Sequence, residues 1–318
     1  MTRAPGTLRW LAIATVAVTY CLVVLGDTVR VTESGMGCRS WPLCNGNLGL
    51  AGNYHAMLEQ SHRYLAAIVT VLVVMTFIVA WRQTSRNRSV RRAALAALVM
   101  IAIQVPLGAI TVFAHNAGWT VAMHLAGAWL LVAAVTTTMV VTLKSTNPGL
   151  PPVDKGVVRA LSAPIYTALA ALFLLAVAGM LVLHLHATLS CHSWPLCPSS
   201  ARAPGVLLQY LHRTMALIAT LALVWLAWRA WRTKHTPALV RRLSALVIGL
   251  LLLTAAFGAV VAVTGAPEYA QDLHLALASL LWLCLVTLAS YTLLRVGETA
   301  VEADQAGMAA SANLAHLA

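Results

Sequence analysis

Apolar stretches of about 20 residues, separated by short polar segments, run along most of the chain. A continuous apolar run of that length crosses about 30 Å of hydrocarbon as an α-helix, whereas a barrel strand would alternate apolar and polar residues. The pattern predicts eight transmembrane helices, over residues 10–29, 63–81, 93–114, 120–143, 161–183, 207–228, 243–264 and 273–294. Because no small-residue cleavage site follows the first run, it is interpreted as a retained helix and not as a signal peptide.

Composition agrees with a membrane protein. Hydrophobic residues make up 60% of the 318 residues and charged residues only 9%, whereas a soluble domain carries about 25% charged residues. The net charge of +12 does not indicate nucleic-acid binding, because the basic residues are not gathered on one face or in one motif. They lie in short clusters between the apolar runs.

The distribution of Lys and Arg predicts the orientation. Basic clusters occupy the connections between helices two and three, four and five, and six and seven, whereas residues 115–119 contain no Lys or Arg. Since cytoplasmic loops are enriched in these residues, the basic loops and both termini are expected in the cytoplasm. The long loops 30–60 and 184–206 then lie outside, and residues 297–318 are expected to form a disordered tail.

The chain contains an internal repeat. Four short motifs recur in the same order at offsets of 150 or 153 residues: Ser-Trp-Pro-Leu-Cys, His-Arg, Gly-Ala and His-Leu-Ala. Each copy holds four helices, an even number, so the copies have the same orientation in the membrane. The predicted fold is all-α, with two parallel four-helix-bundle repeats. Their expected limits are 1–147 and 160–296, joined by a cytoplasmic linker at 148–159.

Paired cysteines occur in both long outer loops: Cys38 with Cys44, and Cys191 with Cys197. An oxidising compartment permits disulfides there. Zinc is the competing interpretation, but five intervening residues are more than zinc ligands usually have between them. We therefore expect each pair to form a disulfide.

One histidine opens each even-numbered helix: His62, His124, His212 and His274. Histidines inside membrane helices are rare and usually functional. The second and fourth helices of a unit run in parallel, so their histidines can face each other as two axial ligands of a haem iron. The alternatives are that the histidines are ordinary polar residues at the membrane interface, or that they bind zinc or copper, since imidazole suits both metals. The pairs lack the third and fourth ligands usual for zinc. The pair His184 and His186 is an alternative copper site.

The two repeats differ beside these histidines. Glu59 lies three residues before His62, on the same side of a helical turn, whereas the equivalent residue of the second repeat is Gln209. A carboxylate transfers protons or stabilises a cation, and an amide does not. The first repeat is therefore predicted to carry the chemistry and the second only a haem, unless Glu59 is merely a solvated acid at a loop end. Gln104 has a second non-equivalent partner, Thr254.

The combined motifs resemble those of bacterial haem A synthases, which oxidise haem O to haem A. The similarity rests on the segment Gly26–Cys44, on Glu-Gln-Ser-His-Arg at 59–63 and on the three later histidine motifs, and it covers residues 10–294. Glu33 departs from the family pattern, where a small residue is expected; this puts the shape of the loop in doubt but not the ligands.

The resemblance implies a haem b cofactor on His212 and His274. It also implies haem O as the substrate near His62 and His124, with Glu59 essential for converting a methyl group to a formyl group by successive hydroxylations. Cys38–Cys44 would form a lid or relay electrons. The expected location is a bacterial inner membrane. The expected partners are membrane lipid, an electron acceptor and the enzyme that supplies haem O. The product would serve terminal oxidase biogenesis. A homo-oligomer is compatible with this picture.

Two other functions are alternatives to a haem-oxidising enzyme. A two-haem membrane cytochrome b for electron transfer would need haems near opposite membrane faces, whereas all four histidines are expected near one face. A transporter built from parallel repeats would need broken helices near mid-membrane, and the third helix offers only Pro106 and Gly108 as a hint.

Overall fold

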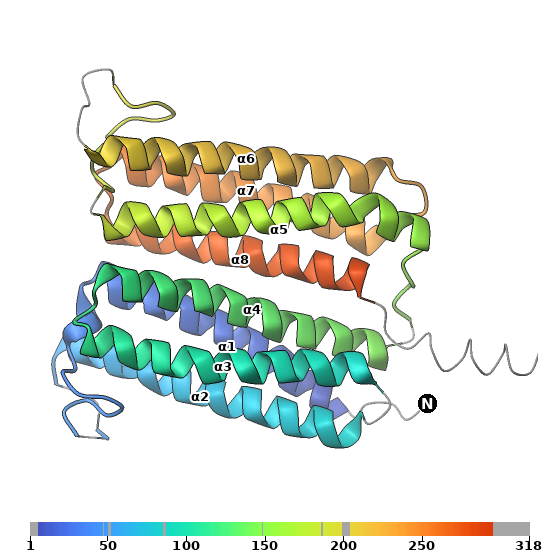
Figure 1. Cartoon of the computed structure of the whole chain (residues 1–318), viewed down its shortest axis with the longest axis horizontal. Helices are drawn as coiled ribbons and strands as arrows, with labels where there is room; N and C mark the ends of the chain where they lie inside the picture. Colours follow the sequence, from blue (N-terminus) through green and yellow to red (C-terminus); the bar gives the residue numbers. More distant parts are fainter. Residues whose placement is uncertain are drawn as a thin grey trace, which may run out of the picture.

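The computed structural model describes residues 6–46, 48–49, 52–84, 87–147, 149–185, 187–198 and 204–294, without the side chains of residues 184 and 204. These residues confirm the predicted all-α fold with its eight long helices (Figure 1). The elements are α1 (Gly6–Val31), η1 (Ser34–Met36), α2 (Tyr54–Gln83), α3 (Arg88–Phe113), α4 (Gly118–Thr146), α5 (Lys155–His184), α6 (Pro204–Arg232), α7 (Ala238–Val263) and α8 (Glu268–Leu293). The predicted tail at 297–318 lies outside the described residues.

All eight helices of the described chain are long and apolar enough to cross a membrane. They contain 26 to 30 residues, which corresponds to about 39–45 Å and exceeds the hydrocarbon core of a bilayer. Large apolar side chains such as Leu207, Leu221 and Leu252 remain exposed on the outer faces of the helices. In water these faces would be unfavourable, and in lipid they are solvated, so the chain is a multi-pass membrane protein.

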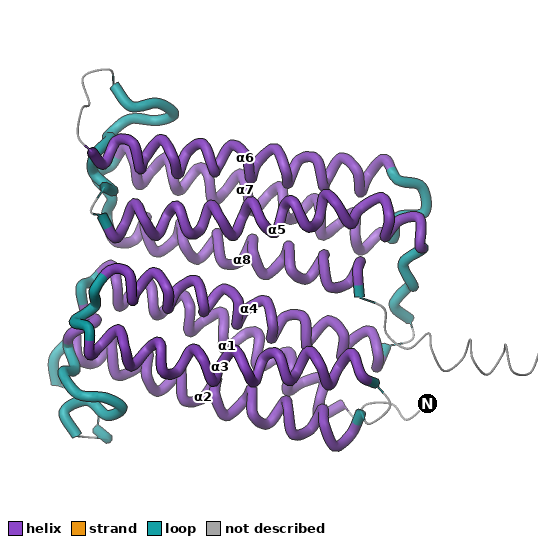
Figure 2. The backbone as a smooth tube through the Cα atoms, viewed as in Figure 1, coloured by secondary structure: helices purple, strands orange, loops and turns teal. Residues whose placement is uncertain are grey.

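The helices form two bundles side by side, α1–α4 and α5–α8 (Figures 1 and 2). The bundles meet through α4 and α1 against α8. At this interface the Trp282 indole N–H donates to the Trp129 carbonyl at 2.8 Å, and the two rings stack with centroids 5.4 Å apart. Because each bundle has four helices, α2, α4, α6 and α8 all begin at the same end of the molecule (Figure 1).

All eight helices begin earlier than the sequence predicted, and α2 and α5 show the largest differences. Helix α2 begins at Tyr54 instead of residue 63, because Asn53 caps it by accepting a hydrogen bond from the Ala56 N–H at 2.8 Å. Helix α5 begins inside the expected linker, where Asp154 accepts from the Gly156 N–H at 2.7 Å. The polar run around Glu59 resembles a loop in the sequence, but it belongs to the first turns of α2.

The two long loops share one local structure, so the repeat extends beyond the helices. Ser40 Oγ donates to the Leu43 carbonyl at 2.6 Å, and Ser193 Oγ donates to the Leu196 carbonyl at 2.5 Å. The Trp–Pro peptide bond within each turn is cis. Each turn is closed by a disulfide, Cys38–Cys44 in the first loop and Cys191–Cys197 in the second.

Candidate functional site

All four singled-out histidines lie in the first turns of the even-numbered helices, at one end of both bundles. His62 and His124 follow the first residues of α2 and α4 by eight and six positions, which places them about 12 and 9 Å along the helix axes. His212 and His274 occupy the same positions in α6 and α8. The two rings within one bundle therefore lie at matching depth.

Each histidine ring faces a glycine on the preceding helix. The pairs, with the distance from a Cβ added to the glycine to the nearest ring atom, are Gly26–His62 (3.0 Å), Gly108–His124 (3.1 Å), Gly179–His212 (3.2 Å) and Gly258–His274 (2.9 Å). Few Cβ atoms in proteins approach another atom so closely. The absent side chains therefore create the space that the rings occupy, and the arrangement is repeated in both bundles.

The second and fourth helices of each bundle carry one of these histidines each, His62 with His124 and His212 with His274. The ring nitrogens differ in their partners. His274 Nδ1 lies 2.9 Å from the Thr254 carbonyl oxygen, whereas His124 Nδ1 lies 3.1 Å from the side-chain nitrogen of Gln104. Two imidazoles at matching depth on parallel helices are the arrangement that a haem with two axial histidines requires.

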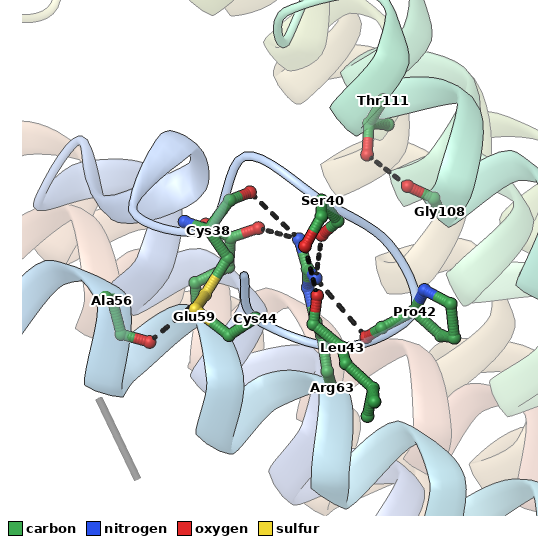
Figure 3. A network of polar contacts seen from close by, with 10 residues as sticks. All are labelled: Cys38, Ser40, Pro42, Leu43, Cys44, Ala56, Glu59, Arg63, Gly108 and Thr111. Carbon is green, nitrogen blue, oxygen red and sulfur yellow. Dashed lines mark hydrogen bonds and ion pairs between the residues drawn. A yellow bond between two sulfur atoms is a disulfide. The ribbon is translucent and has the colours of Figure 1, made fainter. Parts of the chain in front are cut away.

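Glu59 is buried on α2, with 4% of its surface exposed. Its Oε2 accepts from the Cys38 N–H at 2.7 Å, and its Oε1 forms an ion pair with Arg63 at 2.5 Å (Figure 3). Arg63 also donates to the carbonyl oxygens of Ser40 at 2.5 Å and Cys38 at 3.2 Å. Glu59 is therefore not a solvated acid, and it ties the disulfide-closed loop to the helix that carries His62.

The second bundle lacks this ion pair. Gln209, in the place of Glu59, donates to the carbonyl oxygens of Ala187 at 2.8 Å and Thr188 at 3.0 Å. Arg213 still holds its loop, by donating to the Pro195 carbonyl at 2.9 Å, but its Nη2 has no hydrogen-bond partner in the described part of the chain. At this equivalent position, three residues before the histidine, the first bundle therefore has a carboxylate and the second an amide.

An acidic contact that the sequence did not predict lies between the bundles. Asp27 on α1 is 4% exposed and pairs with Arg30 Nε at 2.6 Å. It also interacts electrostatically with Asp272 on α8, whose Oδ2 accepts from Thr28 Oγ1 at 3.4 Å. Arg30 is thus engaged by Asp27, whereas Arg39 is exposed.

Zinc or copper bound without a haem is the alternative kind of metal site. Across the described residues, no three side chains among His, Cys, Asp and Glu converge as a closed metal site would require. The alternative copper pair falls outside the description, which omits His186 and the side chain of His184.

The residues present fit a haem in each bundle. Each bundle offers two imidazoles and, behind each ring, a glycine whose Cβ would fill the space. The sequence singled out all four histidines, but it did not indicate that Gly108 and Gly258 lie against their rings. The contact between glycine and imidazole depends on how adjacent helices pack, although Gly108 and Gly258 both precede their histidines by 16 residues, which is a usable signal.

Two haem A synthases and a protoheme IX farnesyltransferase are among the proteins to which this chain is similar. The heme A synthase of Geobacillus thermodenitrificans is 31% identical over 203 residues, 62% of this chain and 63% of that protein. That of Bacillus pumilus (strain SAFR-032) is 26% identical over 219 residues, 66% and 71% of the two chains. A protoheme IX farnesyltransferase of Halobacterium salinarum (strain ATCC 700922 / JCM 11081 / NRC-1) is 32% identical over 132 residues, 42% of this chain and 30% of that protein.

This chain therefore spans about 63% of the first heme A synthase that it matches. The family model described as "Cytochrome oxidase assembly protein", COX15-CtaA, matches residues 9–53 and 50–286. That match includes Glu59 and all four histidines. A match over nearly the whole helical region shows that this chain belongs to the COX15-CtaA family of cytochrome oxidase assembly proteins.

Proposed function

We propose that this protein is a haem A synthase, which oxidises a methyl group of haem O to a formyl group by successive hydroxylations. The observation that carries the proposal is the glycine-backed histidine pair present in both bundles, together with the buried carboxylate Glu59 where the second repeat has the amide Gln209. The names of the similar proteins from Geobacillus thermodenitrificans and Bacillus pumilus support the same activity.

The difference between the bundles supports a division of labour. The first bundle would bind haem O between His62 and His124, and the second would hold haem b between His212 and His274. Haem b, when bound, supplies one-electron redox chemistry beside the substrate site. The glycines behind the rings would hold each imidazole in place, so that the axial ligands keep one orientation while the substrate reacts.

Glu59 has the position of an electrostatic stabiliser more than that of a base. Both of its oxygens already accept hydrogen bonds, one from the Cys38 N–H and one from Arg63. To accept a proton it would have to release one of these donors, whereas its charge can act without any rearrangement. Glu59 would thus place negative charge one helical turn from His62 when positive charge develops on the substrate.

The disulfide-closed loop supports a role as a lid. Glu59 and Arg63 hold it at the histidine end of the first bundle, where the disulfide Cys38–Cys44 limits its shape (Figure 3). A fixed loop at this end would exclude water from the substrate. The same disulfide could relay electrons, which is the alternative role and requires a redox partner outside the membrane.

The distribution of charge supports a bacterial inner membrane location with both termini in the cytoplasm. Basic side chains gather in the connections α2–α3, α4–α5 and α6–α7, at the end of the molecule opposite the histidines. The haem sites and disulfides would then lie near the outer face. Haem O would arrive from the enzyme that produces it, and an electron acceptor would complete the oxidation.

The direct test is to express the protein with a source of haem O and to identify the extracted haems by mass. We expect haem A. If the protein binds two haems but haem O is recovered unchanged, the protein is instead an electron-carrying cytochrome b.

A further inference from the structure

The histidines on the fourth helix of each bundle, His124 and His274, have different hydrogen-bond partners at Nδ1. Residue 104 on α3 and residue 254 on α7 correspond in the repeat, and each lies beside the Nδ1 atom of the histidine on the next helix. In the second bundle the partner of His274 is a backbone carbonyl. In the first bundle the partner of His124 is the side-chain amide of Gln104.

The direction of the Gln104 hydrogen bonds follows from its second contact. Gln104 Nε2 lies 2.6 Å from the His124 backbone carbonyl oxygen, which can only accept. Exchanging the amide oxygen and nitrogen would bring two acceptor oxygens to that distance, so the amide nitrogen must face this carbonyl. The same nitrogen lies 3.1 Å from His124 Nδ1 and donates its other hydrogen there. His124 Nδ1 is therefore an acceptor.

An acceptor at Nδ1 is unfavourable for binding iron. A neutral imidazole carries one proton, so with Nδ1 accepting a hydrogen bond the proton lies on Nε2, the atom that would bind the metal. His274 has the opposite arrangement, because the Thr254 carbonyl at 2.9 Å requires an N–H on Nδ1 and leaves the Nε2 lone pair free. Metal-binding histidines almost always donate their second nitrogen in the way His274 does.

A glycine makes room for the Gln104 side chain. A Cβ at Gly127 on α4 would collide with Gln104 Oε1, which is buried and has no hydrogen-bond partner among the described residues. The repeat places Leu277 at the position of Gly127 and Thr254 at that of Gln104. The first bundle thus combines a long amide with a glycine, and the second combines a short side chain with a leucine.

We propose that Gln104 is a positioning residue that keeps His124 a weak and exchangeable iron ligand. The inference rests on the proposed function, in which the first bundle binds and releases haem and the second retains its haem. Binding of iron to His124 Nε2 requires the ring proton to move to Nδ1 and the Gln104 amide to release that atom. No such change is needed at His274. Haem should therefore leave the first bundle faster than the second.

The test measures transfer of haem from the purified full-length protein, loaded with two haems, to excess apomyoglobin. We expect a fast phase and a slow phase. His124→Ala should remove the fast phase and His274→Ala the slow one, which assigns each phase to a bundle. Gln104→Met keeps the side-chain volume but removes the amide, and should slow the fast phase on the order of tenfold, the lower range for partners of metal ligands.

Two further variants make the result decisive. Gln271→Met removes an amide that donates to the Ala266 carbonyl at 2.7 Å on α8 and should leave both phases unchanged. The double variant Thr254→Gln/Leu277→Gly moves the amide–glycine pair into the second bundle and should accelerate the slow phase. If Gln104→Met does not fold, this double variant still tests whether an amide beside the histidine accelerates haem release.

The outcomes separate this inference from the proposed function. If the alanine variants each remove one phase but Gln104→Met and the double variant change neither rate, the role of Gln104 is refuted and the haem sites stand. If neither alanine variant changes haem binding, the haem assignment itself is wrong.

Discussion

Each of the four histidine rings packs directly against a glycine on the neighbouring helix. At this scale a single methyl group is large, since an added Cβ at Gly258 would lie 2.9 Å from His274 Cε1 and 3.2 Å from its Nδ1. Nδ1 is the atom that faces the Thr254 carbonyl. Position and hydrogen bonding of the ring therefore depend on the same small gap.

Gly258→Ala should displace the His274 ring. Overpacking typically costs about 1–3 kcal/mol of stability, and the low-spin spectrum of the haem in the second bundle should weaken because its axial ligand moves. Gly249→Ala is the matched control on α7, because nothing lies within 4 Å of its added Cβ. Absorption spectra and thermal unfolding would compare the two, and equal spectra would contradict the role given to Gly258.

Glu59→Gln should abolish haem A formation while haem binding persists. The substitution removes the charge and the ion pair with Arg63 but leaves His62 and its glycine in place. Haem content would be measured by absorption and haem A by mass analysis of the extract. Glu268→Gln, at the exposed start of α8, is the control. A normal yield of haem A from Glu59→Gln would remove Glu59 from the mechanism.

At the scale of elements, the hydrophobic pattern was sufficient to predict all eight helices but not their ends. Apolar runs report the part of a helix that lies in hydrocarbon. The first turns of α2 are polar, so the pattern predicts a loop there, although Asn53 is a recognisable cap. The consequence reaches the site, because Glu59 and His62 lie on one continuous helix and the loop is fixed onto it.

Replacing Cys38 and Cys44 by serine should loosen this loop. Closing so short a loop stabilises by about 2 kcal/mol in the chain-entropy model, and the Cys38 N–H that Glu59 accepts from would lose its constraint. We expect faster amide hydrogen exchange over residues 34–46 and less haem A. The corresponding change at Cys191 and Cys197 should affect only its own loop. Unchanged exchange over 34–46 would contradict the proposed anchoring.

At the scale of the whole molecule, the internal repeat carried most of what could be predicted. Duplication identified the four histidines and the unequal residues Glu59 and Gln209 from the sequence alone. It could not reveal contacts that occur once. Thr28 donates to Asp272 across the two bundles, close to Asp27, and the repeat has Met180 and Ala122 at the positions of the two aspartates. Such contacts depend on how the bundles dock, which no periodicity encodes.

The orientation in the membrane can be tested with single cysteines. In a background with Cys21 and Cys284 replaced by serine, Glu268→Cys marks the histidine end and Lys234→Cys the opposite end, and both positions are exposed. A membrane-impermeant maleimide added to spheroplasts should label the first and not the second. Labelling of residue 234 alone would place the haem sites on the cytoplasmic side.

The central claim is that facing histidine pairs hold iron porphyrins at one end of two sister bundles. The most direct measurement is the electron paramagnetic resonance spectrum of the purified protein, compared with those of His212→Ala and His274→Ala. We expect a low-spin signal typical of two imidazole ligands in the parent protein, and its loss from the second bundle in each variant. A low-spin signal that survives both substitutions unchanged would contradict the account.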